Sequence, residues 1–266
     1  MSRGVVLRLA GLLQSWGETA AFPHRDTAAF PTRSALIGMF AAAQGRTREH
    51  ALDPHPDLPN TPSHHDLVFT LRIDRPGTRH RDFQTAGGGR PHGTGLRTAA
   101  GGYRSQAKST LVTYRDYLAG AVFTVAVQGP APLLRHIADT LAEPCFSPYL
   151  GRRNGLPDEP LIIHTDIPDP VAALRTAVPL SLQHPPAPDA AHIPVTFIHE
   201  HPPALGDTPH RESPSQPSDF TPQARTHLLR PLWQTTEHLP AALYAGPRPI
   251  EALTDYIRKD ISCPRP

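Results

Sequence analysis

The sequence is poor in cysteine, in lysine and in aromatic residues. Its 266 residues include two cysteines, Cys145 and Cys263, too few for a disulfide framework, so the reducing cytoplasm is the expected compartment. The apolar start is interrupted by Arg3 and Arg8, which does not fit a signal peptide. The most apolar stretch, residues 121–127, is far too short to cross a bilayer, so no membrane partner is expected.

Charge of neither sign dominates, because 26 basic residues face 24 acidic ones and the net charge is +2. Net charge alone therefore does not assign a nucleic-acid partner. Only Lys108 and Lys259 are lysines. A GC-rich genome is the simpler cause of this bias, although arginine is also the side chain best suited to grip phosphates in pairs and to stack on bases.

The clearest helix signal is FPTRSALIGMFAAAQG, residues 30–45. Thr32 is placed to cap the first turn, and Gly45 is placed to end the helix. Arg33 and Ser34 fall in the first turn, where free backbone N–H groups favour an anion. Two interpretations stay open: a phosphate-binding helix entrance, or a capped core helix with an exposed arginine.

Residues 82–113 combine seven glycines with Arg90, Arg97, Arg104 and Lys108 and contain one acid, Asp82. Both ends resemble strands, so we predict a long hairpin. Two arms of about 12 residues at ~3.3 Å each would reach roughly 40 Å, well beyond a radius of gyration near 18 Å, so the hairpin must project. A basic arm of this kind, with Tyr103 on one limb, suits single-stranded nucleic acid. The alternative is a disordered glycine-rich insertion.

The remaining elements of the first 165 residues alternate between strands and helices. They are strands at 4–10, 66–74, 119–128 and 161–165 and helices at 30–45 and 130–143. With the hairpin as an insertion at 82–113, this order predicts an α+β domain over 1–165 with a ferredoxin-like β-α-β-β-α-β body.

Residues 166–266 predict a smaller C-terminal region of strands and loops with a terminal extension. A strand is expected at 193–199, an edge strand at 226–233 and a terminal helix at 249–260. Residues 202–221 contain five prolines and few apolar residues, which predicts an irregular loop.

The segment SPYLGRRN, residues 147–154, predicts a tight turn at Pro148 and Gly151 that presents Tyr149, Arg152 and Arg153. If the turn splays the two arginines, both can reach a nucleic-acid backbone. A solvated arginine pair is the alternative.

Five motifs in this order resemble the CasD family, the Cascade subunits of type I-E CRISPR systems in the RAMP superfamily. The motifs are LRLAGLLQSWG (residues 7–17), FPTRSALIG (30–38), DFQT (82–85), YRDYLAGAVFTVAV (114–127) and SPYLGRRN (147–154). The resemblance covers residues 1–165 and implies a ferredoxin-like body with a thumb hairpin. It also implies binding of the 5′ handle of the CRISPR RNA, contacts with the backbone subunit CasC and the large subunit CasA, and indirect contact with target DNA through the complex.

Carried over by position, the resemblance implies twelve RNA-facing residues in three groups. The helix entrance contributes Arg25, Thr32, Arg33 and Ser34, the thumb contributes Arg90, Arg97, Arg104 and Lys108, and the turn contributes Tyr149, Gly151, Arg152 and Arg153.

The leading hypothesis is therefore a non-catalytic RNA-binding subunit of an antiviral ribonucleoprotein, with no cofactor. The alternative is a metal-independent endoribonuclease that processes repeat RNA, for which the nearby acid–base groups are His80, His92, Tyr103 and Lys108. A metal enzyme is the weakest hypothesis, because His199-Glu200-His201 lacks the helical spacing of zinc ligands.

Overall fold

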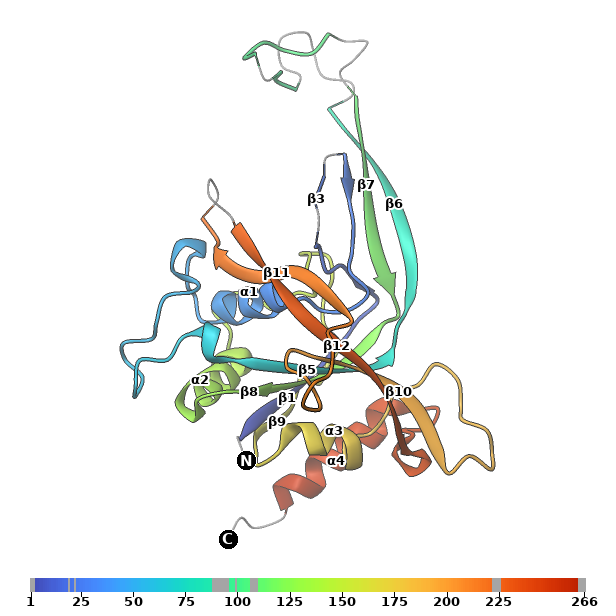
Figure 1. The fold of residues 1–266 in the computed structure, drawn as a ribbon. Helices are drawn as coiled ribbons and strands as arrows, with labels where there is room; N and C mark the ends of the chain where they lie inside the picture. The colour runs from blue at the N-terminus through green and yellow to red at the C-terminus, as the bar shows by residue number, and fades with distance from the viewer. Residues whose placement is uncertain are drawn as a thin grey trace.

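The computed structural model of the protein describes residues 3–18, 20–21, 23–87, 96–98, 100–105, 110–221 and 226–262 (Figure 1). Its strands are β1 (Gly4–Ala10), β2 (Leu13–Gln14), β3 (Ala20–Ala21), β4 (His24–Arg25), β5 (Val68–Arg75), β6 (Thr78–Ala86), β7 (Leu111–Ala119), β8 (Val122–Gln128), β9 (Ile162–Ile167), β10 (His192–His199), β11 (Arg211–Asp219) and β12 (Thr226–Pro240). Its α-helices are α1 (Arg33–Ala43), α2 (Ala131–Ala142), α3 (Pro170–Thr176) and α4 (Pro249–Ser262), and short 3-10 turns include η1 (Arg48–His50) and η2 (His64–Asp66). None of the helices in these ranges combines the length and the apolar composition that crossing a membrane requires.

The body is a mixed α/β structure built on one antiparallel sheet of seven strands, in the order β11-β12-β10-β5-β8-β1-β9. Helices α1 and α2 pack with one face of the sheet, and α3 and α4 pack with the other. Successive residues of a strand point to opposite faces. Every residue of β1 is consequently buried, with Val5, Leu7 and Leu9 in the first core and Val6 in the second.

The elements predicted for the first part of the chain are present in the predicted order. Strands β1, β5 and β9 and helices α1 and α2 lie within a few residues of their predicted bounds. The strand predicted at 119–128 begins at Val122 instead, because Gly120, with φ of 65°, separates β8 from β7. Within the sheet, the four strands of this part adjoin as β5-β8-β1-β9, with α1 between β1 and β5 in the chain and α2 between β8 and β9.

Helix α1 ends as predicted but begins differently. Gly45 adopts φ of 73° and donates its N–H to Ala42 O, while Arg46 donates to Ala41 O, the paired bonds of a glycine-terminated helix. Thr32 occupies the N-cap position, yet its side chain makes no cap hydrogen bond, so the predicted capping role of its hydroxyl was wrong. Packing of Leu36, Ile37 and Phe40 in the core stabilises this helix instead.

The predicted hairpin is formed by β6 and β7 and projects from the body, on the side opposite the chain termini (Figure 1). Its paired strands run in register from Thr78 opposite Ala119 to Ala86 opposite Leu111, so it extends further toward the body than the predicted bounds of 82–113. Its strands are direct continuations of β5 and β8, because only residues 76–77 and 120–121 intervene. Gly77 has φ of 73°, and a Cβ there would lie 2.8 Å from Ala119 O, so this junction requires glycine.

The C-terminal part is more regular than its composition predicts. Residues 211–219 form strand β11 rather than loop, and β12 is a 15-residue strand between β10 and β11 rather than an edge strand, so both predictions were wrong. Pro214 and Pro217 are tolerated because both fall at register shifts in the pairing of β11 with β12, and because β11 is the sheet edge. Strand β10 pairs with β5, so both sides of the predicted boundary near 165 contribute to one sheet.

A buried arginine fastens α3 to the sheet. Arg72 on β5 is fully buried and pairs with Asp74, with Nε 2.7 Å from Oδ1. Its Nη1 donates to Leu174 O and Val178 O, and its Nη2 donates to Pro179 O. Arg72 therefore satisfies carbonyl groups at the C-terminal end of α3 that would otherwise lack partners.

Three histidine rings meet edge to face beside α1. His64 is fully buried, and its ring lies 5.2 Å from that of His55, which in turn lies 5.4 Å from His136. His55 Nε2 also lies 2.7 Å from Arg46 Nη1. Burial is the main cause that lowers the pKa of both His64 and His55 to about 4, and the neighbouring Arg46 and His136 lower it further.

We expect stability to fall as the pH drops below 6.5. The unfolded histidines take up protons near pH 6.5 while the folded ones resist until about pH 4, so the unfolded state binds more protons in between. Acidification from pH 7 to about 5.5 should cost roughly 1.4 kcal/mol for each of the two histidines. Urea unfolding at both pH values measures this loss. His64→Asn keeps a donor for Ala51 O without a titrating ring and should reduce the loss by about half; an unchanged loss would contradict the assignment.

Candidate nucleic-acid interface

The site is organised by the turn at residues 147–155, which packs against the segment after β2. Leu150 is buried and its carbonyl accepts from Ser15 N at 3.1 Å, while Gly155 N donates to Arg152 O at 2.8 Å. Gly151 has φ of 82°, and a Cβ there would lie 1.8 Å from Ser15 O. This position therefore excludes every side chain, and the turn projects Tyr149, Arg152 and Arg153 as predicted.

A cleft of about 560 Å³ lies between this turn and the base of the hairpin. Its walls come from the turn, from β4, from η1 and from the hairpin strands. The lining residues are Arg25, Arg48, Gln84, Arg115, Tyr149, Gly151, Arg152, Arg153 and Asn154. Five of these nine are arginines and none is acidic, so the cleft suits a polyanion that lies along it.

Arg152 is held in place from two sides. Its guanidinium lies over the Tyr117 ring, 5.0 Å from the centroid, and its Nη2 donates to Arg25 O at 3.2 Å. Asn154 Nδ2 donates to the hydroxyl of the same Tyr117 at 3.2 Å. Arg152 Nη1 is buried and has no hydrogen-bond partner within the described residues, so the contacts of Nη2 and of the guanidinium face hold this side chain.

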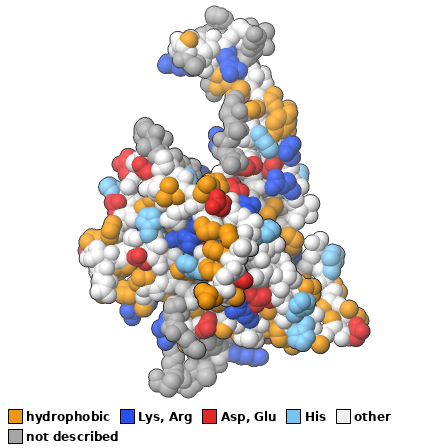
Figure 2. Space-filling model, in the orientation of Figure 1, with side chains coloured by type: hydrophobic (Ala, Val, Ile, Leu, Met, Phe, Trp, Pro, Cys, Tyr) orange, Lys and Arg blue, Asp and Glu red, His pale blue; other side chains and the backbone are white. Residues whose placement is uncertain are grey.

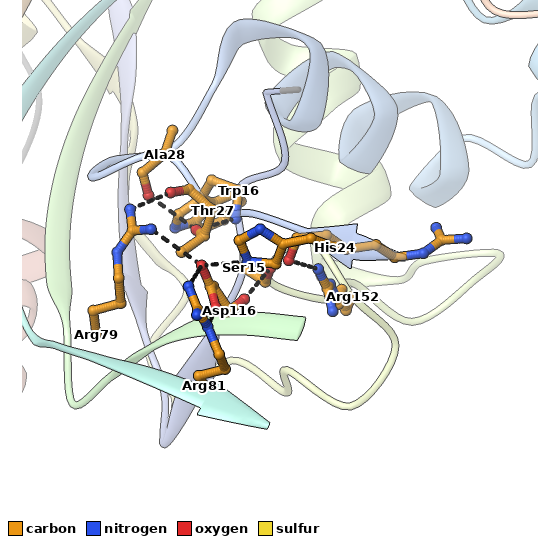
Figure 3. Close-up of polar contacts among 10 residues, drawn as sticks. Ser15, Trp16, His24, Thr27, Ala28, Arg79, Arg81, Asp116 and Arg152 are labelled. Carbon is orange, nitrogen blue, oxygen red and sulfur yellow. Dashed lines mark hydrogen bonds and ion pairs between the residues drawn. The ribbon is translucent and has the colours of Figure 1, made fainter. Parts of the chain in front are cut away.

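The base of the hairpin is tied to the loop before α1 through one buried carboxylate (Figure 3). Asp116 on β7 is fully buried; it accepts from Arg81 Nε at 2.9 Å and from Arg79 Nη1 at 3.2 Å, and His24 Nε2 lies 3.0 Å away. Arg79 also donates to Thr27 O at 2.7 Å. The hydrogen bond from Arg81 is the main cause that lowers the pKa of Asp116, although burial opposes it, so the carboxylate stays ionised and holds β4 and its Arg25 against the hairpin.

The helix entrance divides into exposed and buried residues. Ser34 lines a smaller cavity that also touches Tyr149 and Gly151, so α1 and the turn lie on the same side of the molecule. Thr32 and Arg33 are buried, and Arg33 pairs with Glu200 at 2.8 Å while donating to Leu67 O and His65 O. The prediction that Arg33 and Thr32 face RNA is corrected on this ground, because neither side chain is accessible.

Two of the four predicted thumb residues, Arg97 and Arg104, are described, and neither lines the cleft. Arg97 and Arg104 are exposed in the segment beyond the paired strands, where Arg97 lies over the Tyr103 ring at 5.7 Å. Arg90 and Lys108, like His92 of the nuclease alternative, lie outside the described residues. Figure 2 shows Lys and Arg side chains spaced along the hairpin and a hollow between hairpin and body on that face.

Sequence reasoning missed five residues of this site: Arg48, Gln84, Arg115, Asp116 and Asn154. The strand alternation of β7 contains the signal, since Arg115 and Tyr117 fall on one face and Asp116 on the other. His199-Glu200-His201, considered above for a metal, places Glu200 between Arg33 and Arg230, with Oε2 3.2 Å from Arg230 Nη2. Among the residues the structure describes, no group of three or more possible ligands gathers for a metal.

Fold and site together define an α/β protein with a projecting hairpin and a carboxylate-free arginine cleft. The chain belongs to the Cas5 family of CRISPR-associated proteins, whose model matches residues 4–225.

Its relatives place it within that family. The chain is 31% identical over 189 residues to the CRISPR system Cascade subunit CasD of Escherichia coli strain K12, an alignment that covers 66% of this chain and 77% of that protein. A solved CRISPR RNA-guided surveillance complex contains a chain with 42% identity and a TM-score of 0.84, with 96% of this chain and 99% of that one covered. A crystal structure of a Cas protein matches at 25% identity with a TM-score of 0.56, over 91% and 97% of the two chains. The resemblance to CasD read from the sequence motifs is confirmed.

Proposed function

We propose that this chain is a non-catalytic RNA-binding subunit of a Cascade-type surveillance complex and that the arginine cleft holds the 5′ handle of the CRISPR RNA. The observation that carries the proposal is the cleft itself, with five arginines, a half-buried tyrosine and no carboxylate among its lining residues. Single-stranded RNA is bound by cations along its backbone and by aromatic or arginine planes on its bases. Similarity to CasD supports the same assignment.

This proposed role is consistent with the predicted topology and with the predicted partners of the chain. We infer a ferredoxin-like unit in β1-α1-β5-β8-α2-β9, with the β6–β7 hairpin as its thumb, supported by the adjacency β5-β8-β1-β9. In the assembled complex the chain would contact the backbone subunit CasC and the large subunit CasA and meet target DNA only indirectly.

The endoribonuclease alternative gains no support from the positions of its acid–base candidates. Tyr103 contacts Arg97 beyond the paired strands, whereas His80 lies near the start of β6.

The test compares Arg152→Ala/Arg153→Ala with the unaltered chain in binding a handle-bearing CRISPR RNA at several salt concentrations. Each phosphate contact with single-stranded nucleic acid contributes about 0.7 to the slope of log affinity against log salt. Loss of two contacts should reduce that slope by roughly 1.4 and weaken binding at low salt by about tenfold or more. The RNA should be recovered intact.

The matched control is Arg135→Ala/Arg258→Ala, which removes two exposed arginines from α2 and α4 that do not line the cleft. It changes net charge by the same amount, so it should leave the slope nearly unchanged. Equal slopes for both double variants would remove the cleft from the proposal. Cleavage of the RNA by the unaltered chain in EDTA would favour the endoribonuclease instead.

A further inference from the structure

A second cavity of about 250 Å³ adjoins the cleft and opens beside α1. It shares Arg48, Tyr149 and Gly151 with the cleft, so the two are direct neighbours. Its lining residues are Ser34, Ala35, Gly38, Met39, Ala41, Ala42, Arg46, Arg48, Ala51, Tyr149, Gly151 and Phe220. None of them is acidic.

The residues that line this cavity are of three chemical kinds: small, aromatic and cationic. Small residues of α1, among them Ala35, Gly38 and Ala42, form one wall and leave room for a flat group against the helix. Tyr149 and Phe220 add two aromatic rings, and Arg46 and Arg48 add two cations. A nucleobase needs apolar and aromatic contact for its ring, and its phosphate needs a cation close by, so this combination matches one nucleotide.

We propose that this cavity takes one unpaired nucleobase from the RNA that lies along the arginine cleft. The inference rests on the proposed function and deepens it, because it assigns a base-binding subsite to a region between α1 and the end of β11. Because Arg48 and Tyr149 line both the cleft and the cavity, a strand that turns one base from the cleft into the cavity keeps its contact with Arg48.

Phe220 gives this subsite a fixed wall. Its side chain packs against the first core, and its ring lies 6.0 Å from that of His227 at 68°. Phe220 follows β11, in the stretch predicted to be an irregular loop. The pairing of β11 with β12, which has two register shifts, brings this ring beside α1.

Gly38 keeps the cavity open. It lies in the middle of α1, where glycine disfavours the helix relative to alanine or leucine. A Cβ built on Gly38 meets no other atom within 4 Å, so the core does not require glycine there. A larger side chain would fill the cavity while leaving α1 at least as stable.

The experiment measures binding of the full chain to two single-stranded RNAs of equal length, an oligouridine and an abasic oligonucleotide with the same backbone. The variants are Gly38→Leu, which fills the cavity, and Phe220→Ala, which removes one wall. Ala131→Leu, an equivalent enlargement at an exposed position of α2, is the control. Thermal unfolding is followed in parallel, and Gly38→Leu should melt no lower than the unaltered chain.

The unaltered chain and Ala131→Leu should bind oligouridine about tenfold or more tightly than abasic RNA, because base stacking adds to backbone contact. Gly38→Leu and Phe220→Ala should narrow this ratio severalfold while keeping the affinity for abasic RNA and its salt dependence. If the ratio of affinities for oligouridine and abasic RNA is the same in Gly38→Leu as in Ala131→Leu, the base subsite is overturned. It is also overturned if Gly38→Leu and Phe220→Ala lose the same affinity for both RNAs. Absence of binding to either RNA by the unaltered chain overturns the proposed function as well.

Discussion

Replacing Arg72 by methionine is expected to lower the free energy of unfolding by about 3–5 kcal/mol, because it breaks a buried ion pair from one side. Asp74, only 4% exposed, would keep its hydrogen bonds from Thr124 and Ser181 but lose its countercharge. The carbonyls of residues 174, 178 and 179 would lose their donor at the same time. Urea unfolding at neutral pH measures the change.

The matched control is Arg248→Met. Arg248 makes an ion pair of comparable length with Glu251, at 3.0 Å, but both side chains are mostly exposed. An exposed pair contributes about 1 kcal/mol or less, so this variant should unfold almost like the unaltered chain. Similar losses for both substitutions would show that Arg72 does not fasten α3.

Replacing Gly151 by alanine should displace the turn at 147–155 and abolish most RNA binding. A methyl group would lie 1.8 Å from Ser15 O, a backbone atom that moves only if the segment after β2 moves with it. Since Tyr149 and Arg152 leave the same turn, the cleft and the adjoining cavity would lose shape together. We expect at least the loss of RNA affinity caused by the Arg152/Arg153 double substitution, and a stability loss of roughly 2–4 kcal/mol.

Gly246→Ala separates the two causes of this effect. Gly246 also has positive φ, 73°, yet a Cβ there meets no atom within 4 Å. The Gly246→Ala variant therefore has the backbone strain of a positive φ without a steric clash. It should lower the free energy of unfolding by about 1 kcal/mol and retain RNA binding. If Gly151→Ala behaves in the same way, the close approach to Ser15 does not organise the site.

The elements predicted well from sequence are those whose pattern is local. Strand β1 and helices α1 and α2 can be predicted from the spacing of their apolar residues and, for the end of α1, from Gly45. Strand β11 cannot be predicted in this way, because Pro214 and Pro217 are typical of a loop and are accommodated by the position of β11 at the sheet edge. That position depends on β12, and so on pairing between distant segments.

In the site, too, local features could be predicted from the sequence and long-range contacts could not. The turn signal of SPYLGRRN is sufficient to predict that Tyr149, Arg152 and Arg153 lie on one tight turn, since Gly151 determines the local geometry. Arg33 was assigned to RNA in error, because an arginine at a helix N-terminus can pair with an external phosphate or with a carboxylate inside the protein. Its partner Glu200 lies 167 residues further along the chain, and no local sequence pattern predicts this ion pair.

The two junctions of the hairpin have a mechanical consequence. Because β6 and β7 continue β5 and β8 with only residues 76–77 and 120–121 between, and β5 and β8 are themselves paired, the thumb is a lever anchored in the middle of the sheet. A load applied to its far end is transmitted straight into the central strands. The bend at Gly77 and Gly120 sets the angle of this lever, so the direction in which it projects is determined at its base and not at its tip.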